Sequence, residues 1–168
     1  MPAAELQLER VSPRAIKPGQ ASVLQVTGSN LEKPTGLWTS FPAEVMVLPD
    51  GRFQVQVDSQ LVPQVGAVRV ITAGGISNLR LVLIDRLPTA ARQEKEMQGQ
   101  GLAVGEAVEG HLESESVRSF QLDAEKGTAV TLDVWARRLG SRLDPLLEVF
   151  DAGGREIAVS DDEPGLDG

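Results

Sequence analysis

The residues best suited to chemistry in this sequence are the carboxylates near its C-terminal end. Asp161, Asp162, Glu163 and Asp167 lie within the segment DDEPGLDG, and the fold can bring Asp144 to the same place. Oxygen ligands at this density suit a hard cation such as Ca²⁺, although the spacing differs from that of an EF-hand loop. We predict a Ca²⁺ site with Asp144, Asp161, Asp162 and Asp167 as ligands. The alternative is an acidic, solvated turn.

Side chains that could catalyse a reaction are otherwise scarce. His111 is the single His, and no Ser has the G-x-S-x-G surroundings of an activated nucleophile. The chain has no Cys, which excludes thiol catalysis and zinc sites built from Cys. The glycines between Gly99 and Gly110 do not form the G-x-G-x-x-G pattern of a phosphate loop. We therefore predict that the chain is not an enzyme and that His111 has a surface or strand role.

The remaining candidates for binding are aromatic and basic. Trp38 and Trp135 would offer stacking platforms for a sugar if they were exposed, but a core position is favoured for each. Arg137, Arg138 and Arg142 flank Leu-Gly-Ser and are expected to pair with nearby carboxylates rather than to bind an anion.

The overall composition excludes two classes of partner. The formal net charge of −8 argues against nucleic acid, which requires clustered Lys and Arg. No run of about 18 apolar residues is present, so membrane insertion is not expected. The start MPAAELQLERV lacks the basic and apolar regions of a signal peptide. Either the protein stays in the cytoplasm or the numbering begins after a removed signal.

The first half of the chain is predicted to form short strands separated by turns. The segment 53–57 alternates strictly, which places Phe53, Val55 and Val57 on a buried face. Asp50-Gly51 before it is a hairpin-turn signal. Further strands are expected at 6–11, 22–27, 44–48, 67–72 and 79–84. Strands at this spacing are typical of a β-sandwich.

The second half follows a polar connector with several Gly, expected over 87–105. The longest predicted strand is 128–136, with Val130, Leu132, Val134 and Ala136 on one face. Val117 and Phe120 are further candidates for its core. The other expected strands are 107–112, 117–122, 146–150 and 156–160, the last two joined by the hairpin loop DAGGR.

The first half also resembles a known family. Its order SP…KPGQ…LQVTGSNL…VRVITAGGISN is similar to an IPT/TIG-type immunoglobulin-like module. In that family a Pro-Gly turn precedes a strand ending in Gly-x-Asn-Leu, and a Gly-x-Ser-Asn step precedes the final strand. The resemblance implies an immunoglobulin-like β-sandwich over 1–86. The matching residues are Pro18, Gly19, Gly28, Asn30, Leu31, Gly75, Ser77 and Asn78.

The second half resembles the bacterial pre-peptidase C-terminal (PPC) family. The similarity lies in Gly110, Leu112, Phe120 and the AEKG turn, and in the run from Ala136 to Asp167 with its Leu-Asp-Pro step and D-x-x-G hairpin. It implies a jelly-roll-like β-sandwich over 106–168, so the expected fold class is all-β with two tandem β-sandwich modules. Because such modules continue past the acidic cluster, we expect a fragment with uncovered strand edges and an exposed apolar face.

Together the two resemblances are similar to the architecture of planctomycete-type secreted proteins. They imply a non-catalytic pair of binding or accessory modules located outside the cell, at the cell surface or in the periplasm. The expected partner is an extracellular polymer or protein, or an attached catalytic domain for which the pair is a spacer. The alternative is the non-catalytic N-terminal region of a larger secreted hydrolase whose active domain lies beyond Gly168. The full-length gene sequence distinguishes the two.

Overall fold

The computed structural model describes residues 5–90, 99–113 and 115–161. Within these residues the regular structure is β-strand, apart from one 3-10 turn, η1 (Arg137–Leu139), which confirms the all-β prediction. No helix in the described part of the chain is long and apolar enough to cross a membrane. The chain divides into two compact units, residues 1–93 with 105–110 and residues 94–104 with 111–168.

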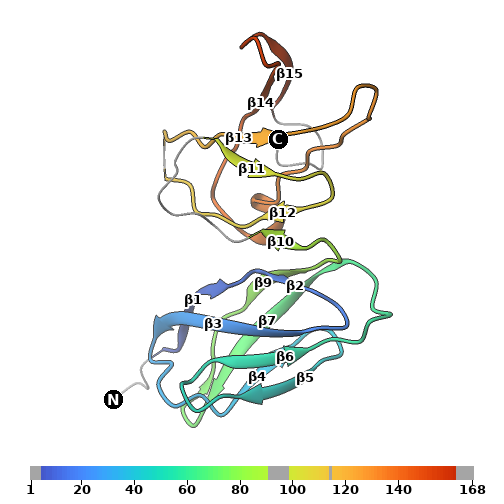
Figure 1. Cartoon of the computed structure of the whole chain (residues 1–168). Helices are drawn as coiled ribbons and strands as arrows, with labels where there is room; N and C mark the ends of the chain where they lie inside the picture. Colours follow the sequence, from blue (N-terminus) through green and yellow to red (C-terminus); the bar gives the residue numbers. More distant parts are fainter. Residues whose placement is uncertain (1–4, 91–98, 114, 162–168) are drawn as a thin grey trace. The chain divides into compact units, whose positions relative to one another are not determined.

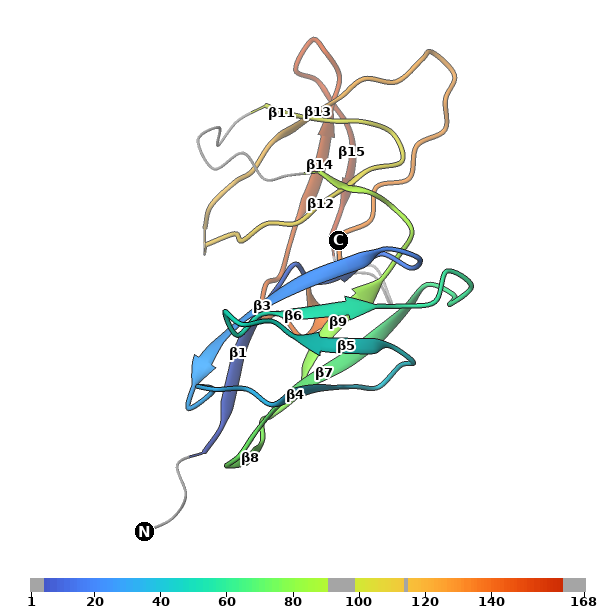
Figure 2. The same ribbon diagram turned by 60° about the horizontal axis from the view of Figure 1, so that its bottom comes forward.

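The first unit is a sandwich of two sheets, which Figures 1 and 2 show stacked face to face. One sheet has four antiparallel strands in the order β1-β3-β6-β5, and the other has the order β2-β9-β7-β4 with β8 paired to β7. The strands are β1 (Gln7–Ser12), β2 (Ala15–Ile16), β3 (Ala21–Ser29), β4 (Gly36–Thr39), β5 (Glu44–Val47), β6 (Phe53–Gln56), β7 (Gln64–Thr72), β8 (Gly75–Ile76) and β9 (Arg80–Ile84).

The core of this unit lies between the two sheets and follows the alternation of the strands. Phe53, Val55 and Val57 are fully buried, which confirms the predicted inward face of 53–57. Val68, Val70, Val82 and Ile84 meet them from the other sheet and are also fully buried. Burial of this kind supplies most of the stability of a β-sandwich.

The turn predicted at Asp50-Gly51 is present. Gly51 has a φ of 82°, and its amide donates to the Leu48 carbonyl at 2.9 Å. The Arg52 guanidinium hydrogen-bonds the Asp50 carboxylate and holds the pKa of that carboxyl below its usual value. The turn thus closes the hairpin that aligns β5 with β6.

Asn78 of the Gly-x-Ser-Asn step connects the two sheets, and Ser77 bonds on its own side of the sandwich. Leu8 donates its amide to Asn78 Oδ1 at 2.6 Å, and Asn78 Nδ2 donates to the Leu8 carbonyl at 3.0 Å. Ser77 is buried; its hydroxyl accepts from the Val70 amide at 2.9 Å and donates to the Asn78 carbonyl at 2.7 Å. These hydrogen bonds explain why the sandwich needs Ser and Asn at positions 77 and 78. They do not test the IPT/TIG assignment, which stays a prediction.

The segment expected as a connector contains two short strands that belong to different units. β10 (Thr89–Ala90) pairs in parallel with β12 (Ala107–Val108) in the first unit. β11 (Gln100–Leu102) pairs in parallel with β13 (Phe120–Leu122) in the second. The second unit also has the hairpin of β14 (Leu147–Phe150) and β15 (Glu156–Ser160), as the sequence predicts. A PPC-like sandwich stays a prediction for this unit.

The long strand predicted over 128–136 is wrong, because none of these residues belongs to a strand. Its apolar face is also divided: Ala136 is buried, whereas Val130 and Leu132 are exposed. Alternation in a sequence reports which residues share a face, but a strand also needs a partner for its backbone hydrogen bonds. Between 128 and 136 the chain has no such strand partner among the described residues.

The second unit buries few of its apolar side chains. Ala136 and Leu139 are its buried apolar residues within the described ranges. Val117, expected in the core, is 83% exposed, and Phe120 is exposed as well, so both expectations are wrong. The outer face of the hairpin also shows Phe150 and Val159 to solvent.

Candidate functional site

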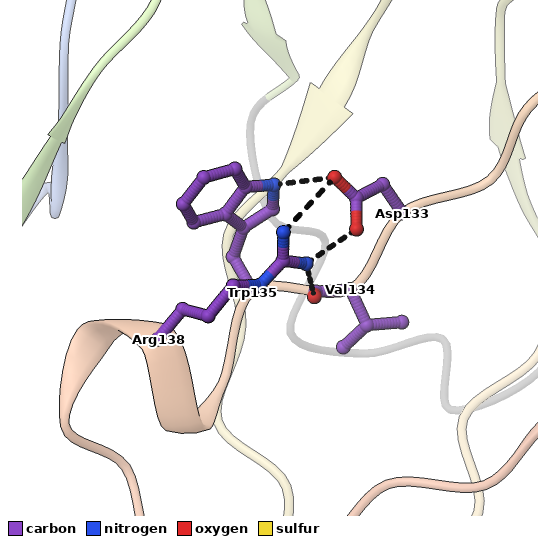
Figure 3. A network of polar contacts seen from close by, with 4 residues as sticks. All are labelled: Asp133, Val134, Trp135 and Arg138. Carbon is purple, nitrogen blue, oxygen red and sulfur yellow. Dashed lines mark hydrogen bonds and ion pairs between the residues drawn. The ribbon is translucent and has the colours of Figure 1, made fainter. Parts of the chain in front are cut away.

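A cluster of interacting side chains is centred on Trp135, in the segment that leads into η1. Leu139 and Ala136 in this segment are buried. Gly140 ends it in the left-handed conformation, with φ of 72°. Because η1 reverses the chain, Arg138 folds back over the residues that precede it. Figure 3 shows Asp133, Trp135 and Arg138 facing one another across this corner.

The three side chains form a closed set of interactions (Figure 3). The Arg138 guanidinium carbon lies 3.9 Å from the centre of the Trp135 ring, a cation–π arrangement. The indole Nε1 donates to Asp133 Oδ2 at 2.9 Å. Arg138 Nη2 donates to Asp133 Oδ1 and to the Val134 carbonyl. The indole is therefore held in its plane and from one of its faces.

This arrangement offers a rigid aromatic surface rather than a reactive group. Trp135 is 36% exposed, so part of the indole is open to solvent. The charge of Arg138 is compensated by Asp133, so the cluster suits a ligand without a strong charge. A sugar ring is such a ligand, since its C–H groups stack on aromatic faces. Asp133 is not among the predicted binding residues, although its position two residues before a Trp is a usable signal.

Both Trp residues differ from the core position that was favoured for them. Trp38 is 44% exposed, and the expectation of a core aromatic is wrong for it. The neighbouring Leu37 is buried instead, because alternation along β4 turns Trp38 to the outer face of the sheet. Trp135 keeps a third of its surface exposed while its ring contacts Arg138.

The predicted Ca²⁺ ligands are only partly within the described residues. Asp144 accepts an ion pair from Arg137 Nη2 at 2.5 Å, with both side chains more than half exposed. Asp161 is exposed and directly follows β15. Asp162, Glu163 and Asp167 lie outside the described residues. Within the described ranges no three acidic, His or Cys side chains form a metal-binding group, so the Ca²⁺ site stays a prediction.

If Asp144, Asp161, Asp162 and Asp167 bind Ca²⁺, millimolar CaCl2 is expected to raise the melting temperature of the full chain. A ligand at about 100 times its Kd stabilises the folded state by roughly 2.7 kcal/mol. Differential scanning fluorimetry with CaCl2, and with MgCl2 as the control, measures the shift. Asp144→Asn should abolish the shift. An unchanged melting temperature in CaCl2 would contradict the site.

Other positions offer no catalytic arrangement within the described residues. His111 is exposed, as predicted, and its carbonyl accepts a hydrogen bond from Arg118 at 3.2 Å. A hollow of about 280 Å³ in the first unit is lined by residues that include Lys17, Asp85 and Thr89, without His or aromatic side chains. It therefore lacks both a His base beside a nucleophile and a stacking surface. The predicted carboxylate pairing of Arg137 and Arg138 is confirmed.

Comparison with known proteins gives little further assignment. No protein-family model matches the chain, and neither does any curated protein. Among solved structures it is similar to SGBP-B of the Bacteroides ovatus mixed-linkage glucan utilization locus, in complex with a mixed-linkage heptasaccharide. The identity is 14% and the TM-score 0.36, over 56% of this chain and 26% of that chain. The chain thus spans about a quarter of that protein's chain, and no family membership follows from these values.

Proposed function

We propose that this chain is a non-catalytic binding protein of the cell surface, the periplasm or the extracellular space, and that it binds a polysaccharide through Trp135. The observation that carries the proposal is the indole of Trp135, fixed by Arg138 and Asp133 yet 36% exposed. A preorganised aromatic ring binds with a small loss of side-chain entropy, because its rotamer is already fixed.

The chemistry of the cluster supports a neutral polymer as the ligand. Asp133 and Arg138 compensate each other, so a bound sugar meets a ring and hydrogen-bonding groups rather than a net charge. The second Arg nitrogen near Asp133, at 3.5 Å, is a weak contact that a sugar hydroxyl can replace.

Trp135→Ala is expected to weaken binding to the recognised polysaccharide by roughly 10- to 100-fold, as for an aromatic residue at the centre of a binding surface. Affinity electrophoresis of the full chain in gels containing cellulose derivatives, xylan, mannan or starch identifies the polymer. Isothermal titration with its oligosaccharides then gives the Kd. Trp135→Phe, which keeps a ring but loses the hydrogen bond to Asp133, should retain part of the affinity.

Val117→Ala is the matched control, because Val117 is exposed in the same unit and away from the cluster contacts. Its Kd should equal that of the wild type. The same Kd for Trp135→Ala and the wild type would contradict the role of Trp135. If the wild-type chain binds none of the polysaccharides but captures a defined surface protein, the polysaccharide proposal is wrong and the partner is a protein.

A further inference from the structure

The outer face of the five-stranded sheet is a second exposed surface with an unusual composition. The inward positions of β4, β7 and β9 are filled by core residues, so the alternate positions point outward. Their register places Trp38 opposite Arg69, Ala67 opposite Leu81 and Val65 opposite Leu83. Ile71 completes this face on β7. The outward positions of these three strands carry no Asp or Glu, so Arg69 is the one charged residue among them.

Arg69 has no partner for its charge among the described residues. Its Nε is buried and makes no hydrogen bond there, as is also true of Arg138 Nε. Arg138, however, pairs with Asp133 through Nη2, and Arg69 has no such carboxylate in the described part of the chain. Buried polar groups are nearly always hydrogen-bonded, and an exception needs an explanation. Arg69 is therefore an isolated positive charge on an apolar face of a protein whose net charge is −8. A carboxylate would supply both a hydrogen-bond acceptor and the opposite charge.

Trp38 supplies a stacking surface directly beside this cation. Residues opposite each other in an antiparallel pair have Cβ atoms about 4.5–5.5 Å apart on one face of the sheet. Trp38 and Arg69 are such a pair. On this face Trp38 has Gly36 as its neighbour on β4, and Ala67 and Ile71 as its diagonal neighbours on β7. Trp38 is 44% exposed on this face, opposite Arg69 in the register of the two strands.

We infer that this face binds a carboxylated polysaccharide, with one uronate residue on the Trp38–Arg69 pair. The C–H face of the sugar ring stacks on the indole, and the carboxylate accepts charge-assisted hydrogen bonds from the Arg69 guanidinium. This charge complementarity distinguishes the site from the compensated cluster at Trp135. The net charge of −8 repels dense polyanions, so the fitting polymer carries separated carboxylates. The site is additional to the function proposed for Trp135.

The test compares an acidic oligosaccharide with its uncharged ester. We expect the full chain to bind tri-galacturonate with one free carboxylate at least tenfold more tightly than its full methyl ester, by isothermal titration. Arg69→Gln should remove this preference, because it weakens binding of the acid and leaves binding of the ester unchanged. Arg69→Lys keeps the charge and should keep part of the preference. Trp38→Ala should weaken both ligands roughly tenfold or more, and Trp38→Phe should restore most of the affinity.

Three outcomes would overturn the inference. The wild-type chain could bind the acid and the ester with equal affinity, or bind neither. Arg69→Gln could also keep the preference for the acid while its melting temperature is unchanged. Self-association lost in Trp38→Ala, measured by sedimentation velocity, would assign the face to a second copy of the chain instead. Trp135→Ala should leave the preference for the acid unchanged, so failure at Trp135 and failure at Trp38 are distinguishable.

Discussion

Replacing Phe53 with Ala is expected to lower the free energy of unfolding of the first unit by about 3–5 kcal/mol, the range for truncating a buried aromatic ring. The Phe53 side chain is fully buried in the core, with 0% relative exposure to solvent. It lies on β6 between β3 and β5, opposite Leu24 on one side and Val47 on the other. Removal of its ring leaves a cavity that two paired strands prevent from collapsing.

Met46→Ala is the matched control for Phe53→Ala. Met46 lies on the adjacent strand β5 but is 53% exposed, so its truncation should cost less than about 1 kcal/mol. Urea titration in a Trp135→Phe background reports the first unit, because Trp38 is then the remaining fluorophore of a chain with two Trp residues. If the urea midpoints of the two variants shift equally, Phe53 is not part of the core of the first unit.

The strands of the first half can be predicted from the sequence for a physical reason. Its strands are short, alternate strictly and are separated by turns whose residues tolerate their geometry, as at Asp50-Gly51. Because one face of each strand is buried, alternation determines which side chains form the core, as for Phe53 and Val55. The same rule applied to Trp38 would have turned it outward, opposite to Leu37. The expectation of a core position for Trp38 is therefore wrong.

The second half was less predictable because its structure depends on pairings that the sequence does not encode locally. The segment 128–136 alternates as well as 53–57, yet it has no strand partner among the described residues. The parallel pairs β10–β12 and β11–β13 join segments that are distant along the chain and only two or three residues long. Such pairs leave almost no periodic signal. The hairpin β14–β15 is the exception, since the two Gly of DAGGR mark its turn.

The two candidate binding surfaces differ in how far the sequence reveals them. Asp133, Trp135 and Arg138 are close along the chain, so their meeting needs only the turn at η1 and Gly140. Trp38 and Arg69 meet only through the register of β4 on β7, which cannot be read from the sequence. Their opposite electrostatics follow from one carboxylate: Asp133 compensates Arg138, and nothing equivalent stands beside Arg69 on its sheet face.

The Ser77-Asn78 step has the second large expected effect on stability. Asn78→Ala should lower the free energy of unfolding of the first unit by about 2–4 kcal/mol, since it leaves both backbone groups of Leu8 without their partner. Leu8 lies where the register between β1 and β3 shifts, and its side chain is fully buried. The Asn78 amide pairs with Leu8 as a neighbouring strand would, and it connects the two sheets where the ladder is interrupted.

A graded series tests this role of Asn78. Asn78→Asp keeps an acceptor for the Leu8 amide but loses the donor to the Leu8 carbonyl, so it should cost less than Asn78→Ala near neutral pH. Gln25→Ala is the control, because Gln25 is exposed on β3 and its loss should cost no more than about 1 kcal/mol. Urea midpoints give the order. If Asn78→Ala costs no more than Gln25→Ala, water replaces the amide at Leu8, and the Ser-Asn step does not hold the sheets together.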